Sequence, residues 1–161
     1  MIVGVDNGSC SGAMVALTDD GEVLGYTRLP AYKPKKQPKE LVLEEFVEWV
    51  KMWEEPVSLV AVERPLTFSR SVQAMRSMAL CYGQIQGLCA GLGWRHEGID
   101  VRAWQNAMLG YFPKGQSKRA ALRKARQLAP SEKWCSSRGN KPHDGIIDAY
   151  LIGMYALEKK I

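Results

Sequence analysis

The sequence predicts an α/β fold in which helices flank a mixed five-stranded sheet. Short apolar runs bounded by turn residues are typical of buried strands, whereas longer segments repeat their apolar residues at the helical period. The two kinds of segment begin in the order βββαβαβα, and two further helices follow. Because Asp19, Asp20 and Gly21 form a strong hairpin signal, we expect the sheet to open with antiparallel strands before the helices intervene.

The strands are predicted at residues 2–6, 9–17, 23–29, 57–63 and 94–101. A polar turn at residues 7–9 separates the first strand from the second. The segment from Lys33 to Lys39 is rich in lysine and contains two prolines, so it is predicted to be a basic loop and not a helix.

The helices are predicted at residues 41–53, 71–92, 103–109, 117–128 and 143–158, with Ser117 as the cap of the fourth. Gly83, Gly87 and Gly91 recur at every fourth position of the second helix. Glycine costs about 1 kcal/mol in a helix interior. We therefore expect this row to permit close packing against another helix or the sheet.

Length and composition are those of one folded domain spanning residues 1–161, since 46% of the residues are hydrophobic. No apolar segment approaches the roughly 20 residues that span a bilayer, so no membrane association is expected. The four cysteines lack the spacing of a zinc site and are interpreted as reduced thiols, which predicts a cytoplasmic location: Cys10, Cys81, Cys89 and Cys135.

The net charge of +5 is distributed unevenly along the chain. Residues 40–55 contain six glutamates and one lysine, whereas residues 64–131 contain eleven Lys or Arg and two acids. One interpretation is a basic face that approaches a polyanion. The other is an unevenly charged solvated surface, and charge alone favours neither.

Four carboxylates occupy positions that a globular protein normally keeps apolar. Asp6 and Glu63 each end a predicted buried strand, and Asp144 and Asp148 are spaced to share one face of the last helix. The first and fourth strands can lie side by side in a mixed sheet, which would bring Asp6 and Glu63 together. Such a group can bind hard divalent cations, with two metals supporting phosphodiester hydrolysis.

Each carboxylate also has a structural interpretation. Asp6 can cap the following turn, Glu63 can pair with Arg64, and Asp144 can be an acid favoured by the helix dipole. Asp148 is the hardest to explain in this way because its neighbours in the helix are apolar. Taken together, the four residues favour the metal site.

A basic segment near the fourth helix carries no acid and contains Lys114, Lys118, Arg119, Arg123, Lys124 and Arg126. Its charges favour contact with a phosphate backbone, although a solvated face is the alternative. Arg70 and Arg76 flank the start of the long second helix, where they can position a DNA strand. Phe68 precedes them and either stacks on a base or pins its loop to the core.

The chain resembles the RuvC-type Holliday junction resolvases, which have a ribonuclease H-like fold, and in particular their compact phage-encoded members. The matching segments run nearly from end to end: Val3–Gly8, Ala13–Leu17, Ala61–Arg64, Cys81–Gly87, Lys118–Leu122 and His143–Ala149. The resemblance implies Mg²⁺-dependent cleavage of branched DNA, with Mn²⁺ able to substitute, by a homodimer that nicks two symmetry-related strands. Flaps and forks are further possible substrates, and a phage-encoded member would act in the host cytoplasm.

The resemblance also implies residue roles. Asp6, Glu63 and Asp148 correspond to metal ligands, Asp144 to the fourth carboxylate, and Lys118 to a lysine near the scissile phosphate. Many cellular members have an acid or histidine three residues before the last aspartate, where this chain has Gly145. The alternative functions are cleavage of RNA–DNA hybrids on the same fold and non-catalytic nucleic-acid binding.

A four-way junction presents two equivalent strands, so a protein with one metal site must pair to cut both. The segment 71–92 is the expected pairing surface because it is more apolar than one packed side requires. We expect its glycine row to face one neighbour, and Met75, Met78 and Tyr82 to face another.

Overall fold

The computed structural model describes residues 1–8, 11–32, 34–35, 37–65, 67–68, 71–136 and 139–161. Its strands are β1 (Ile2–Asp6), β2 (Ala13–Leu17), β3 (Val23–Arg28), β4 (Ala31–Tyr32), β5 (Glu40–Leu41), β6 (Leu59–Glu63) and β7 (His96–Ile99). Its helices are α1 (Leu43–Lys51), α2 (Val72–Leu92), α3 (Val101–Leu109), α4 (Ser117–Leu128) and α5 (Asp144–Glu158). None of these helices is long and apolar enough to cross a membrane.

The main sheet has five strands in the order β3-β2-β1-β6-β7. β1, β2 and β3 form an antiparallel meander, whereas β6 and β7 run parallel to β1. The predicted mixed five-stranded sheet is therefore confirmed, and so is the expectation that the first strand lies beside the one ending at Glu63. The hairpin turn is also confirmed, with Gly21 in the left-handed region (φ 89°) and the amide of Thr18 bonded to the carbonyl of Glu22 (2.9 Å).

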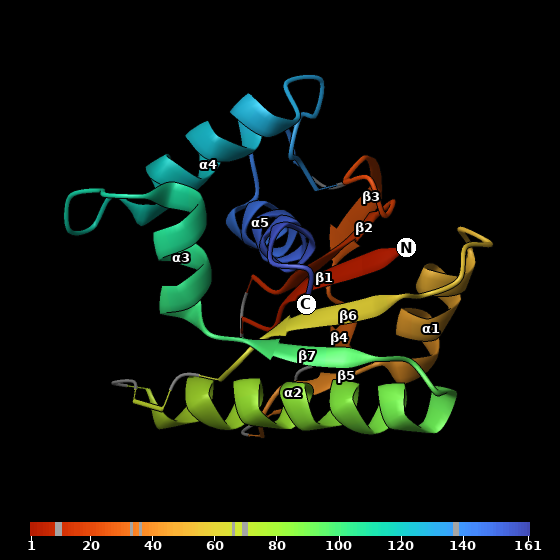
Figure 1. Ribbon diagram of the computed structural model, residues 1–161. Helices are drawn as coiled ribbons and strands as arrows, with labels where there is room; N and C mark the ends of the chain where they lie inside the picture. Colours follow the sequence, from red (N-terminus) through yellow and green to blue (C-terminus); the bar gives the residue numbers. More distant parts are fainter. Residues whose placement is uncertain (9–10, 33, 36, 66, 69–70, 137–138) are drawn as a thin grey trace.

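Both faces of the sheet are covered by helices (Figure 1). Side chains alternate along each strand. On β1, Ile2 packs into the core beneath α3, α4 and α5, whereas Val3 and Val5 pack into the core over α1 and α2. The sheet is the middle layer of three, and its central strands β2, β1 and β6 are buried on both sides because each side carries a helical layer.

α5 packs unusually close to β1 because glycines line the contact. A Cβ at Gly4 would overlap the carbonyl oxygen of Ala149 and would lie 2.8 Å from the amide nitrogen of Gly153. A Cβ at Gly153 would in turn lie 2.8 Å from the side chain of Leu17. Larger residues at these positions would push the helix away from the sheet, and with it the two aspartates that the helix carries.

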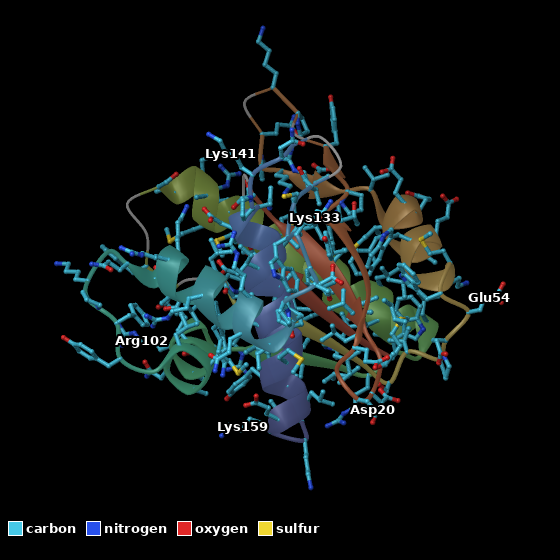
Figure 2. The ribbon with its side chains drawn as sticks, turned by 90° about the horizontal axis from the view of Figure 1, so that it is seen from above. Asp20, Glu54, Arg102, Lys133, Lys141 and Lys159 are labelled. Atoms are coloured by element: carbon cyan, nitrogen blue, oxygen red, sulfur yellow. The ribbon has the colours of Figure 1, made fainter. Side chains whose placement is uncertain are left out.

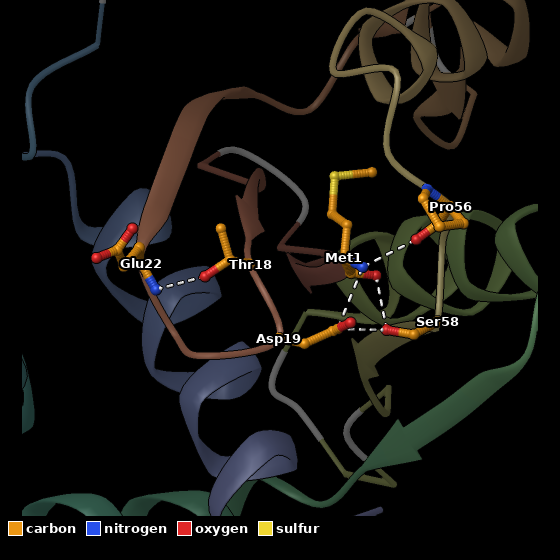
Figure 3. Close-up of polar contacts among 6 residues, drawn as sticks. All are labelled: Met1, Thr18, Asp19, Glu22, Pro56 and Ser58. Carbon is orange, nitrogen blue, oxygen red and sulfur yellow. Dashed lines mark hydrogen bonds and ion pairs between the residues drawn. The ribbon is translucent and has the colours of Figure 1, made fainter.

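At the end of the sheet where β1 begins, a polar network joins three segments (Figure 3). The amino-terminal ammonium of Met1 donates to the carbonyl of Pro56 (2.8 Å) and pairs with Asp19 (3.2 Å). Ser58 donates to the carbonyl of Met1 and to the Asp19 carboxylate (both 2.9 Å). This network fixes the start of β1 against the segment that leads into β6.

Several predicted boundaries were wrong. β2 begins at Ala13 and not at residue 9; residues 9 and 10 lie outside the described part, and Gly12 is held in a turn by the carbonyl of Gly8 (3.1 Å). Ser117 is the first residue of α4 and not its cap. The small sheet of β4 and β5 was not predicted, since each strand has only two residues. It flanks the predicted basic loop, whose described residues form no helix.

Within one chain, the close packing expected for the glycine row is not found among the described residues. A Cβ at Gly83, Gly87 or Gly91 would meet nothing within 4 Å among the described residues, so this row faces outward. Met78 is 8% exposed and lies on the opposite, core-facing side of α2 with Cys81 and the other buried residues of that helix. The second interface expected for Met78 is therefore the chain's own core.

Candidate active site

Asp6 and Glu63 end adjacent parallel strands. Val5 is in register with Val62, so each acid is one residue beyond a paired position at the same edge of the sheet. The two-residue period places Asp6 on the same face as Gly4, against α5, and places Glu63 on the same face as Ala61. The side chains thus share the face that α3 and α5 cover.

The other two acids come from the beginning of α5. His143 caps this helix through its Nδ1, which accepts from the amide of Ile146 (3.3 Å). Gly145 lies directly against the Asp6 segment, because a Cβ there would overlap the carbonyl of Ser11 and lie 2.9 Å from Oδ2 of Asp6. The first turns of α5, which carry Asp144 and Asp148, are therefore brought up to the C-terminal end of β1.

The contact at Gly145 leaves no room for a side chain at this position. An acid or histidine at position 145 would collide with the backbone at Ser11. In this chain the additional acid is Asp144, one residue earlier, where the first turn of α5 has room for a side chain that is 42% exposed.

Burial and mutual repulsion raise the pKa values of three of the acids. The pKa of Asp148 is raised to about 8, first by burial and then by the charges of Asp6, Glu63 and Asp144. The pKa of Glu63 is raised to about 7 by burial and by Asp6. Burial also raises the pKa of Asp6 to about 6, against the opposing effects of the Gly8 amide and Lys39. The acids therefore lie within electrostatic reach of one another.

Hydrogen bonds orient the two strand-end acids. The amide of Gly8 donates to Oδ1 of Asp6 (2.8 Å), which is the turn-capping contact considered from the sequence. The indole Nε1 of Trp104 donates to Oε2 of Glu63 (3.0 Å). Arg64 pairs with Glu97 (3.6 Å) across the ends of β6 and β7.

Lys118 joins the site from α4. Its Nζ forms a hydrogen-bonded ion pair with Oδ2 of Asp144, and this contact raises the pKa of the lysine. The Lys118 side chain is 76% exposed. A mobile exposed ion pair contributes little to stability, so its significance is positional. It puts a cation at the rim of the carboxylate group.

The donor set fits a hard divalent cation in its chemistry. Carboxylate oxygens are the ligands that Mg²⁺ and Mn²⁺ prefer, and a bound cation would relieve the repulsion that raises these pKa values. Within the described part of the chain, no three acidic, histidine or cysteine side chains already converge in a metal-binding geometry. Like charges repel when no cation lies between them, so a closed ligand sphere would require the side chains to rotate inward.

The basic residues predicted to contact DNA lie mainly along α4. Lys114, Lys118, Arg119, Arg123 and Arg126 are exposed, and Lys124 is half-buried. The helix packs inward through Ala120, Ala121 and Ala125, so its charges face outward. Arg76 is exposed on the first turns of α2, whereas Arg70 lies outside the described residues.

Phe68 is 84% exposed. Of the two interpretations of this residue, anchoring of its loop to the core is therefore wrong. Phe68 follows the end of β6 at Glu63 by five residues.

Two residues near the acids were missed by sequence reasoning. Trp104 is a core residue that is 1% exposed, and its indole reaches Glu63. Lys39 ends the predicted basic loop, but it is 8% exposed and its Nζ donates to the carbonyl of Gly8 (3.3 Å). Both contacts join residues that are far apart in the sequence, so no local sequence pattern predicts them.

Comparison with solved structures finds proteins of similar fold. Thermus thermophilus RuvC in complex with a Holliday junction substrate matches with a TM-score of 0.60 over 99% of this chain and 94% of that one, at 14% identity. A second Thermus thermophilus RuvC structure matches with a TM-score of 0.56 over 99% and 95%, also at 14% identity. The chain has the RuvC fold.

This likeness confirms the expected ribonuclease H-like architecture. At sequence level, a scan of protein-family models and a search of curated proteins found no match. The RuvC fold thus positions acids at the adjacent ends of β1 and β6 and at the start of the last helix, and the chemistry of those residues is a separate question.

Proposed function

We propose that the chain is a Mg²⁺-dependent endonuclease that cleaves four-way junctions and other branched DNA. The observation that carries the proposal is the gathering of Asp6, Glu63, Asp144 and Asp148 at one end of a RuvC-like sheet. Burial of several acids together is destabilising without a cation, so a fold that keeps them there is best explained by a metal-dependent activity.

In this proposal Asp6, Glu63 and Asp148 hold the metal, and Asp144 completes the carboxylate group. Bound Mg²⁺ would supply an activated water and charge stabilisation for in-line hydrolysis of a phosphodiester. Asp6 is oriented through Gly8 and Glu63 through Trp104. Lys118, paired with Asp144 at the rim, would exchange this partner for the scissile phosphate when DNA binds.

The basic face of α4 would carry the DNA backbone. Lys118 stands at its beginning, beside the acids, and Arg119 and Arg123 continue along the exposed side. This arrangement would lead a phosphate chain toward the site and would support binding without base recognition. The exposed ring of Phe68 would stack on an unpaired or distorted base at a branch.

We also propose that two copies pair through the outward face of α2. That face is formed by small or apolar residues and has Arg76 as its single charge: Val72, Arg76, Ala79, Gly83, Gly87, Ala90, Gly91 and Leu92. A row of exposed glycines lets two helices approach closely, and a dimer would present two sites to two equivalent strands.

The deciding experiment is cleavage of labelled four-way junction, flap, duplex and RNA–DNA hybrid, each with Mg²⁺ and with excess chelator. We expect Mg²⁺-dependent cuts at symmetry-related positions of the junction and little cleavage of plain duplex. Cleavage restricted to the hybrid would replace the proposal by ribonuclease H-type activity. Tight junction binding with no cleavage in Mg²⁺ or Mn²⁺ would replace it by a non-catalytic binding role.

A further inference from the structure

We propose that Trp104 is a positioning residue that fixes the Glu63 carboxylate for metal binding, an inference that rests on the proposed function. The contact is the hydrogen bond from the indole Nε1 to Oε2 of Glu63 (3.0 Å). An indole N–H can only donate, so it engages the carboxylate as an acceptor and restricts its rotation. One oxygen of Glu63 is thereby held on the α3 side of the site.

The indole is itself held rigidly. Trp104 is 1% exposed and belongs to the core between the sheet and the helices α3, α4 and α5. It lies in the first turn of α3, whose start is fixed by Asp100 through bonds to the amides of Arg102 (2.9 Å) and Ala103 (3.1 Å). The donor therefore has little freedom to follow a moving carboxylate.

The two partners are also tied together through the backbone. β6 ends at Glu63 and β7 ends at Ile99, in register with it. The amide of the next residue, Arg64, donates to the carbonyl of Ile99 (2.8 Å), and α3 begins two residues after Ile99. The scaffold that carries the acid is thus bonded to the scaffold that carries the indole.

A second buried tryptophan shows that this bond is not a general consequence of burial. Trp134 is 0% exposed and packs its ring against Tyr150 (centroids 4.5 Å apart) and Tyr26 (5.6 Å). Its indole nitrogen has no hydrogen-bond partner among the described residues. Trp104 and Trp134 are therefore a matched pair that differ in contact with the carboxylate group.

Hydrogen bonds to a ligating carboxylate orient the ligand and raise metal affinity, and losing one typically costs about 10- to 100-fold in affinity or activity. Trp104→Phe keeps most of the buried ring and removes the N–H. We expect it to weaken Mn²⁺ binding to the DNA-free protein by about tenfold or more. Junction cleavage should fall at low Mg²⁺ and recover in large part at high Mg²⁺.

Trp134→Phe is the control, because it removes a similar ring from the same core without touching an acid. It is expected to lower Tm yet leave Mn²⁺ affinity within about twofold of wild type. Calorimetric titration with Mn²⁺ and thermal unfolding are measured for all proteins. If Trp104→Phe does not fold, β-(3-benzothienyl)alanine at position 104 preserves the shape of the side chain while lacking the N–H.

Three results would overturn the inference. Wild-type Mn²⁺ affinity in Trp104→Phe or the benzothienyl variant would show that the bond does not position Glu63. Equal weakening in Trp104→Phe and Trp134→Phe would reduce the effect to packing. Failure of the wild type to bind Mn²⁺ at all would contradict the proposed function itself. The titration of the wild-type protein distinguishes this outcome from the other two.

Discussion

At the scale of single residues, the acids of the site oppose folding when no cation is bound. Burial raises the pKa of Asp148 to about 8, of Glu63 to about 7 and of Asp6 to about 6. Because these values are above those of the unfolded chain, the native state binds protons more tightly than the unfolded state. The stability that tighter proton binding gives the native state is present at low pH and is lost as pH rises from about 4 to about 8.

The first prediction is that metal-free protein becomes less stable across this pH range and that Mg²⁺ restores stability chiefly at its upper end. Deprotonated acids bind the cation, so the Mg²⁺-induced rise in Tm should grow from pH 5 to pH 8. Thermal unfolding with Mg²⁺ or with chelator, at a series of pH values, measures it. A Mg²⁺ effect that is independent of pH would contradict the assignment.

Asp148→Asn is the matched variant for this measurement. It removes the acid with the most raised pKa, so at pH 8 without metal it should stabilise the protein by about 1 kcal/mol or more, roughly 2–4 °C in Tm. His143 has a pKa lowered mainly by burial and contributes the opposite pH slope. Since His143 is retained in the variant, the difference between the two proteins isolates Asp148.

The acids could be predicted from the sequence because Asp6 and Glu63 each end an apolar strand, and because Asp148 has apolar neighbours in its helix and shares one helix face with Asp144. The residues that orient them could not be predicted in the same way. Trp104 and Glu63 are 41 positions apart, and Lys39 and Gly8 are 31 positions apart. A buried tryptophan satisfies the expectation for a core residue, so its second role has no signature in the local sequence.

At the scale of elements, the site depends on how closely α5 lies against β1. The sequence pattern predicted this helix almost to its ends, and a short apolar run predicted the strand. The distance between α5 and β1 was not predictable, because it is set by close contacts that Gly4, Gly145 and Gly153 make with other segments. The two-residue strands β4 and β5 escaped prediction for a related reason, since such short pairing leaves no periodic pattern.

The second prediction concerns Gly145→Ala. The added methyl group would overlap the carbonyl of Ser11 and approach Oδ2 of Asp6, so α5 must shift. We expect a loss of roughly 1–3 kcal/mol in stability and a larger loss of Mn²⁺ affinity. Gly139→Ala is the control, because its nearest neighbour would be the Ser136 hydroxyl at an ordinary 3.8 Å. Normal stability and metal binding in Gly145→Ala would contradict the close contact.

The third prediction concerns the basic face of α4. Replacing Arg123 and Lys124 together by Ala should weaken binding to all branched DNA alike. The slope of the logarithm of the binding constant against the logarithm of the salt concentration should become shallower by about one to two units, roughly one for each lost phosphate contact. Fluorescence anisotropy across a range of salt concentrations measures both effects.

Lys159 and Lys160 provide the control for that variant. Lys159 lies at the end of the molecule away from Lys141, which precedes the helix that carries the acids (Figure 2). Replacing both terminal lysines by Ala removes the same formal charge and should leave the slope nearly unchanged. Equal slopes for the Arg123 and Lys124 variant and the wild type would mean that the α4 face is only solvated.

At the scale of the whole molecule, the proposed pairing of two copies depends on the outward face of α2. The sequence drew attention to this helix because the segment 71–92 is more apolar than one packed side requires and repeats glycine at every fourth position. The sequence did not reveal which side of α2 faces the core, since the helix carries small and large apolar residues on all of its sides. Met78 lies on the core side, so a charged residue there would disrupt folding and not test pairing.

The fourth prediction is therefore made for Gly87→Glu. A carboxylate at this outward position meets open space in one copy and would repel its counterpart between two copies. Light scattering should show a monomer, and a cruciform plasmid should be nicked on one strand where the wild type linearises it. Met52→Glu places the same acid at another exposed apolar position and should remain dimeric. A monomeric wild type, with and without junction, would contradict the pairing model.

The most direct test of the metal-dependent nuclease is a comparison of cleavage and binding for Asp6→Asn and Asp148→Asn on a labelled four-way junction in Mg²⁺. Removing either charge should abolish cutting while binding stays equal or becomes tighter, because fewer acids repel the phosphates. Asp20→Asn, at the end of the molecule far from Lys141, should cut like the wild type (Figure 2). Cleavage within about tenfold of wild type in either site variant would contradict the assignment of these acids.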